Sequence, residues 1–106
     1  MIFITGPLFC GKRAYARTLC DEDEMCVNAH DLAARETDLP ALADALASQY
    51  KVVISTETGG GVVPADAAQR AAREAAGRLA CLLAERADTV VRVLCGLPMA
   101  LKGELP

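Results

Sequence analysis

The sequence predicts a three-layer α/β fold, in which helices cover both faces of a small, mostly parallel sheet of about four strands. Four short apolar segments alternate with segments of mostly helical pattern. The two strongest, residues 51–56 and 89–94, are almost continuously apolar. Strands of this kind are typical of parallel sheets that are buried on both faces. Right-handed connections between such strands place helices on the two sides of the sheet.

The length and composition fit a single α/β domain that spans residues 1–106. Hydrophobic residues make up 53% of the chain, but only 4% are aromatic. We therefore expect a close-packed core of alanine, leucine and valine. Because a short domain buries a smaller share of its surface than a large one, we also expect stability to draw on self-association, and predict a homo-oligomer.

The charge and the cysteines argue against several classes of protein. A net charge of −3 gives no sign of a nucleic-acid-binding surface, and no apolar run reaches membrane length. None of the five cysteines forms a C-x-x-C pair, so no metal site is predicted. We expect a reduced, cytoplasmic protein without a signal peptide, with Cys20, Cys81 and Cys95 as small core residues.

The first half of the chain is predicted to contain two strands and one helix. Residues 2–5 form the first strand, and a helix follows from residue 12 to about residue 20. Four consecutive carboxylates at residues 21–24 oppose the dipole of a helix C-terminus, so the helix should stop before them. We interpret this acidic run as a solvated loop, because a metal site would need a shaped loop to converge the side chains. A weak strand is predicted at residues 25–28.

The second half is predicted to contain two longer helices that flank the strand at residues 51–56. Thr37 or Asp38 can cap the first, and Pro40 is tolerated in its first turn. Its apolar side chains recur at helical spacing: Leu39, Leu42, Ala43, Leu46, Ala47 and Tyr50. The other helix is predicted near residues 65–87, opened by Pro64.

Residues 6–13, GPLFCGKR, follow the first strand and nearly match a phosphate-binding loop. In such loops, backbone N–H groups surround a phosphate, a lysine neutralises it, and a Ser or Thr hydroxyl holds magnesium. Gly6, Gly11 and Lys12 occupy three defining positions. The residues that we expect to bind a nucleotide are Gly6, Cys10, Gly11, Lys12 and Arg13.

Three residues of this loop depart from the pattern. Pro7 donates no N–H, Phe9 is bulky, and Arg13 stands where the hydroxyl should be. Arg13 cannot ligate magnesium, although it can bind phosphate directly. The loop therefore predicts binding of an anion without metal-assisted transfer. An ordinary strand-to-helix turn remains the alternative.

A second glycine motif follows the strand at residues 51–56. Glu57 stands at the strand end, where α/β proteins place ligands, and three glycines follow at residues 59–61. This pattern makes Glu57 a candidate catalytic residue. The alternative is a mobile turn on which Glu57 is simply exposed.

Taken together, the two motifs resemble the adenosylcobinamide kinase / adenosylcobinamide-phosphate guanylyltransferase family of cobalamin biosynthesis. That family carries Asn-Glu-Val-Gly-x-Gly-[Ile/Val]-Val-Pro after a valine-rich strand. The matching residues are Glu57, Gly59, Gly61, Val63 and Pro64, then Arg73, Glu74, Gly77, Arg78, Ala87, Asp88, Val90, Gly96, Leu97, Pro98 and Lys102. The resemblance covers residues 1–19 and 50–103. It implies a P-loop NTPase-like fold, ATP or GTP as nucleotide, cobinamide phosphorylation, GMP transfer through a histidine, and an oligomer.

The segment between these regions does not resemble the family, which is longer there. The missing part carries the histidine that accepts GMP and an aspartate near magnesium. His30 does not match the guanylylated segment, so we expect a surface or loop histidine.

Three hypotheses follow for the function. The first is a working family enzyme. The second, which we prefer, is a shortened, divergent relative that binds ATP, GTP or another phosphate compound with little or no family catalysis. We do not expect this binding to require magnesium. The third is a non-enzymatic oligomeric interaction module of P-loop ancestry.

Overall fold

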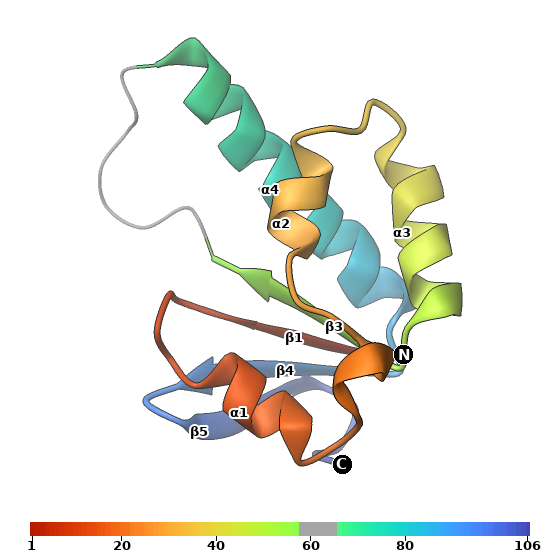
Figure 1. The fold of residues 1–106 in the computed structure, drawn as a ribbon, viewed down its shortest axis with the longest axis vertical. Coiled ribbons are helices and arrows are strands. Elements are labelled where there is room, and N and C mark those ends of the chain that lie inside the picture. Colours follow the sequence, from red (N-terminus) through yellow and green to blue (C-terminus); the bar gives the residue numbers. More distant parts are fainter. Residues whose placement is uncertain (58–65) are drawn as a thin grey trace.

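The computed structural model describes residues 1–57 and 66–106, which form a sheet with helices on both faces (Figure 1). The sheet has five strands in the order β2-β3-β1-β4-β5. The first four strands are parallel, and β5 runs antiparallel to β4. Their bounds are β1 (Ile2–Gly6), β2 (Met25–Cys26), β3 (Val52–Thr56), β4 (Thr89–Leu94) and β5 (Leu97–Lys102).

The helices divide unequally between the two faces of the sheet. The short helix α1 (Lys12–Arg17) covers one face. The other face carries α2 (Ala29–Ala33), α3 (Leu39–Gln49) and α4 (Ala67–Arg86). The short 3-10 helix η1 (Glu22–Glu24) leads into β2. The predicted three-layer α/β fold with a mostly parallel sheet is therefore confirmed.

Neighbouring residues of the central strands belong to separate hydrophobic cores. Phe3 packs with α2, α3 and α4, whereas Ile4 packs with α1. In the same way Val53 and Ile54 point to opposite faces, and all four side chains are at most 2% exposed. Burial on both faces explains why these strands are continuously apolar in sequence.

The fifth strand was not predicted, because its turn lacks the usual residues. Cys95 and Gly96 join β4 to β5 with positive φ angles of 52° and 75°. Two positive φ angles are typical of a type I′ hairpin turn, which prefers Asn-Gly. With cysteine in the first place the turn has no strong signature. β5 itself is mostly exposed, so it adds little apolar periodicity.

Several predicted boundaries shift. The first helix ends at Arg17 rather than near residue 20, and the weak strand has two residues instead of four. Asp38, not Thr37, caps α3, because its side chain accepts a hydrogen bond from the Ala41 N–H at 3.1 Å. The predicted start of the long helix at residues 64–65 lies outside the described residues. In the described part Asp66 caps α4 by accepting from the Ala68 N–H.

The prediction for three cysteines was wrong. Cys81 and Cys95 are exposed and Cys20 is only partly buried, because Cys81 lies on the outer side of α4 and Cys95 on the hairpin turn. The buried cysteines are Cys10 and Cys26, and all five are free thiols.

Within residues 1–57 and 66–106, no helix combines the length and apolarity that crossing a membrane requires.

Candidate functional site

The candidate site lies at the carboxyl end of β1, in the middle of the sheet. β1 is hydrogen-bonded to β3 on one side and to β4 on the other. The chain leaves β1 towards α1 on one face, while the helix after β3 is α4, on the other face (Figure 1). Opposite departures of this kind open a crevice between two strand ends, where open α/β sheets bind ligands.

The backbone of the loop after β1 has left-handed or extended positive φ angles at three positions: 156° at Gly6, 60° at Phe9 and 94° at Gly11. Gly6 packs very closely. A Cβ on it would lie 2.5 Å from the Val93 carbonyl oxygen and 2.8 Å from the Cys10 sulfur. No side chain fits there, so the loop requires glycine at this position.

Lys12 folds back across the loop. Its side chain is 7% exposed, and its Nζ donates a hydrogen bond to the Pro7 carbonyl oxygen at 2.7 Å and lies 3.7 Å from the Cys10 sulfur. A buried ammonium is costly unless it is paired and hydrogen-bonded. Here a neutral carbonyl and a thiol are its hydrogen-bond partners, so an anion in the loop would supply charge that these partners lack.

A cavity of about 320 Å³ opens beside the loop. It brings together four of the five predicted binding residues, Cys10, Gly11, Lys12 and Arg13, while Gly6, the last residue of β1, does not line it. The remaining lining residues come from the loop, α1 and the region of β2 and β3: Leu8, Phe9, Ala14, Val27, Ile54 and Thr56.

Arg13 lies at the rim of this cavity and is half-exposed. Its Nη2 is 4.0 Å from Glu22 Oε2, and Arg17 donates a hydrogen bond to the same carboxylate. The guanidinium of Arg13 is therefore drawn partly towards η1. A ligand in the cavity would compete with Glu22 for it.

Glu57 reaches the site from the end of β3 but does not line the cavity. Its N–H donates to the Gly6 carbonyl oxygen at 2.9 Å. Its carboxylate accepts two hydrogen bonds of 2.8 Å from the Nε and Nη2 of Arg92 on β4. The hydrogen bond from Arg92 lowers the pKa of Glu57, and the charges of Arg92 and Lys12 act in the same direction.

Arg92 is a site residue that the sequence reading missed. The two groups, Arg92 and Glu57, form an ion pair that spans β1, and the Glu57 carboxylate raises the already high pKa of Arg92. The signal was present, since Arg92 is the one charged residue in the apolar strand β4. The arrangement provides a hydrogen-bonded carboxylate rather than a free base.

His30 lies close to the same strand end, which contradicts the prediction of a surface or loop histidine. It belongs to α2, and its side chain is 20% exposed. Its Nδ1 accepts a hydrogen bond of 3.1 Å from the Thr56 N–H, because α2 packs against β3. A neutral imidazole that accepts at Nδ1 carries its proton at Nε2. Neither nitrogen then has a free lone pair for nucleophilic attack.

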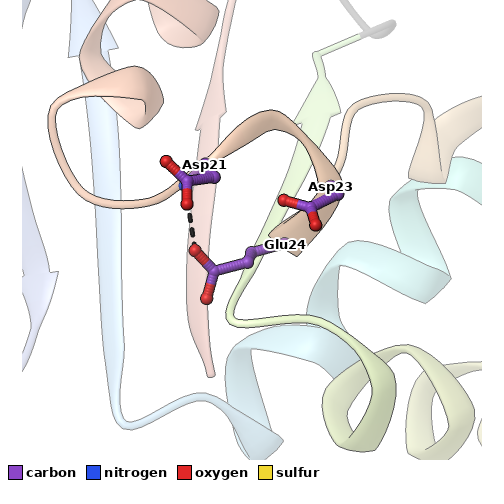
Figure 2. Close-up of side chains that lie close together, drawn as sticks. All are labelled: Asp21, Asp23 and Glu24. Carbon is purple, nitrogen blue, oxygen red and sulfur yellow. Dashed lines mark hydrogen bonds between the residues drawn. The ribbon is translucent and has the colours of Figure 1, made fainter.

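The acidic run lies near the amino ends of the strands, before β2; it is largely solvent-exposed, as predicted, but residues 22–24 form η1 rather than a loop. Carboxylate oxygens of Asp21, Asp23 and Glu24 lie within 4.8 Å of one another (Figure 2). Asp21 and Glu24 form a reciprocal capping box, in which the Asp21 N–H donates to Glu24 Oε1 at 3.0 Å. Local capping thus accounts for the proximity of these two side chains.

Comparison with known proteins relates most of the chain to one family. Residues 22–101 match the family described as cobinamide kinase / cobinamide phosphate guanyltransferase. Over 53 residues, which are 50% of the chain, the sequence is 45% identical to the bifunctional adenosylcobalamin biosynthesis protein CobP of Pseudomonas aeruginosa. That aligned stretch covers only 31% of the relative's length.

The extent of the family match differs from the resemblance seen in the sequence. It runs through residues 22–49, where we found no resemblance, and it begins after residues 6–13. The evidence for a phosphate-binding loop therefore comes from the loop itself: its backbone angles, the close approach at Gly6 and the buried ammonium of Lys12.

Proposed function

The chain belongs to the cobinamide kinase / cobinamide phosphate guanyltransferase family, and from this premise we propose that it binds a nucleotide or another phosphate-bearing small molecule at residues 6–13. The proposed binding residues are Gly6, Cys10, Gly11, Lys12 and Arg13. ATP and GTP are the proposed nucleotides. The activities named for the family and for the relative are only proposed for this chain, because the aligned stretch covers 31% of that relative.

The buried ammonium of Lys12 is the observation that carries this proposal. Its strongest contact is a single hydrogen bond of 2.7 Å to a neutral carbonyl oxygen. The adjoining cavity is lined by Cys10, Gly11 and Arg13, among others. An anion there would meet two cations, and charge-assisted hydrogen bonds are about twice as strong as neutral ones.

We further propose that the chain performs little or none of the family's chemistry and is a shortened, divergent relative. Phosphoryl transfer depends on positioning and charge neutralisation, with a metal that usually bridges the β and γ oxygens. Arg13 replaces the hydroxyl that would hold this metal. Glu57 is held in an ion pair with Arg92, and the Nδ1 of His30 accepts a hydrogen bond from the Thr56 N–H. These contacts leave neither side chain free to act as a base or a nucleophile.

The second candidate function is a non-enzymatic interaction module in a homo-oligomer. It is favoured by four exposed apolar side chains in the C-terminal part of the chain: Leu97, Met99, Leu101 and Leu105. Exposed apolar residues that gather on one strand and its tail are typical of interaction surfaces. This function and anion binding are compatible in one protein.

Calorimetric titration of ATP and GTP, with and without magnesium, tests the main proposal. We expect binding that does not require magnesium. The Lys12→Ala variant should weaken it roughly tenfold or more, the effect of losing a hydrogen bond to a charged group. Lys51→Ala is the matched control, because Lys51 is an exposed lysine at the amino end of β3, and it should leave the affinity unchanged.

Two results would contradict the proposal. Absence of binding to both nucleotides would leave the interaction module as the better hypothesis. Binding that requires magnesium, together with turnover of cobinamide, would identify a working enzyme in which Thr5, Ser55, Thr56 or Glu57 has taken over the metal.

A further inference from the structure

Phe9 is the most exposed of the large apolar side chains in the described part of the chain. It is 94% exposed, and the preceding residue, Leu8, is 64% exposed. Both residues are among those that line the cavity beside the loop. Burial in the core of this chain therefore explains neither residue.

The backbone of Phe9 is also unfavourable for its residue type. Its φ angle is 60°, in the left-handed region, where a bulky side chain is a genuine outlier. Glycine adopts this conformation without a steric penalty. The loop accordingly needs a left-handed residue at this position, but nothing in its backbone needs an aromatic ring.

The cavity combines a cationic part with an apolar part. Lys12 and Arg13 provide the charge, whereas Leu8, Phe9 and Ile54 provide apolar surface. Its volume of about 320 Å³ lies at the lower end of the range for cavities that hold small organic ligands. Inorganic phosphate would use the charges and leave the apolar part unoccupied.

We propose that Phe9, together with Leu8, recognises an aromatic or flat apolar group that is carried by the bound phosphate compound. The proposal rests on anion binding at residues 6–13 and adds the ligand class, a phosphate ester whose organic group lies against the ring of Phe9. The phosphate faces Lys12, and the organic group covers the otherwise exposed apolar surface of the two loop residues.

Calorimetry with two probes, inorganic phosphate and 1-naphthyl phosphate, tests this ligand class. The natural sequence should bind 1-naphthyl phosphate roughly three- to tenfold more tightly than inorganic phosphate, as expected for one aromatic contact. In Phe9→Gly this preference should disappear while the affinity for inorganic phosphate stays unchanged. Phe9→Leu, which keeps apolar area but has no ring, should give an intermediate preference.

Met99→Ala is the control, because it removes an exposed apolar side chain on β5 that does not line the cavity. It should not alter the preference. A thermal melt of Phe9→Gly should show that this variant folds, since glycine adopts a positive φ angle without steric strain.

The outcomes separate this inference from the proposed function. If the natural sequence binds neither probe, the inference is overturned, and the titrations with ATP and GTP decide the proposed function separately. Equal affinities for the two probes, or a preference that persists in Phe9→Gly, would overturn the inference and leave anion binding standing.

Discussion

At the carboxyl ends of the strands, the contacts of Arg92 and His30 join residues far apart in the chain, whereas the acidic turn near the amino ends is hydrogen-bonded by its neighbours. Arg92 and Glu57 are separated by 35 positions, and His30 and Thr56 by 26. In the acidic turn, Asp21 and Glu24 cap each other. The candidate site and the acidic turn thus obtain their polar order in different ways, although the amino ends of the strands also carry one long-range ion pair, between the Met1 ammonium and Asp88.

This difference separates a site from a dense cluster of charge. The acidic turn has the greater concentration of carboxylates, but its geometry is that of a capped 3-10 turn on an exposed surface. The carboxyl ends instead carry charges of both signs, among them a buried ammonium and an ion pair that spans a strand. Groups held by distant elements cannot relax independently, which is the arrangement expected of a preorganised binding site.

The largest expected effect comes from Gly6→Ala at the carboxyl edge. The new Cβ would meet the Val93 carbonyl oxygen at 2.5 Å, within the central sheet, where neither strand can move freely. We expect a loss of roughly 2–4 kcal/mol in the free energy of unfolding, the size typical of overpacking combined with an unfavourable backbone angle. Urea denaturation monitored by circular dichroism measures it.

Substitutions of two other glycines provide the comparison for Gly6→Ala. Gly103→Ala creates a similar clash, with the Asp88 carbonyl oxygen at 2.7 Å, but at the amino edge and after the last strand. It should cost less, about 1–2 kcal/mol, because the chain there can shift. Gly77→Ala on α4 meets nothing within 4 Å and should stabilise by roughly 0.5–1 kcal/mol through helix propensity. A smaller cost for Gly6→Ala than for Gly103→Ala would contradict the proposed rigidity of the carboxyl edge.

His30→Ala should have the next largest effect. It removes the acceptor of the Thr56 N–H, which is part-buried. We expect a loss of about 1–2 kcal/mol, since an unsatisfied backbone donor adds its desolvation cost to the lost hydrogen bond. His30→Asn is the matched variant, because the Asn Oδ1 can take the place of Nδ1, and it should recover part of the loss in the same denaturation experiment. Equal losses in the two variants would assign the effect to packing alone.

The sequence was sufficient for those parts of the fold that follow from local pattern. Continuous apolar runs predicted β3 and β4, and the spacing of Gly6, Gly11 and Lys12 predicted a glycine-bounded loop between β1 and a helix. The missed elements are those with weak local signals. α2 has only five residues, and the β4–β5 turn carries cysteine where asparagine is usual.

The contacts of the candidate site could not be predicted in the same way. Nothing near Arg92 in the sequence indicates Glu57 as its partner, because the pairing depends on β3 and β4 lying on either side of β1. The bond between His30 and Thr56 depends likewise on α2 packing against β3. Family resemblance did not indicate the pair of His30 and Thr56 either, because His30 stood outside its matching segments.

The smallest expected effects come from substituting two glutamates that pair with arginine: Glu57 at the carboxyl ends of the strands and Glu22 near the amino ends. The hydrogen bond from Arg92 lowers the pKa of Glu57, and the hydrogen bond from Arg17 lowers that of Glu22. A carboxylate whose pKa is lower in the folded protein contributes stability above its unfolded pKa of about 4.3. That contribution is lost as the pH falls through the folded pKa. The natural sequence should therefore be more stable than the Glu57→Gln variant at pH 7, and this difference in stability should shrink below about pH 4.3.

Salt distinguishes the two edges in this experiment. Glu22 is exposed and pairs with exposed arginines, so about 1 M NaCl should remove most of the difference between the natural sequence and Glu22→Gln. The Glu57 carboxylate is two-thirds covered and accepts two hydrogen bonds from one guanidinium, so more of its contribution should survive. Thermal melts at low and high salt, each at pH 7 and pH 3.5, measure both. Equal salt sensitivity of the two variants would show that the ion pair at the candidate site is no better ordered than a surface pair.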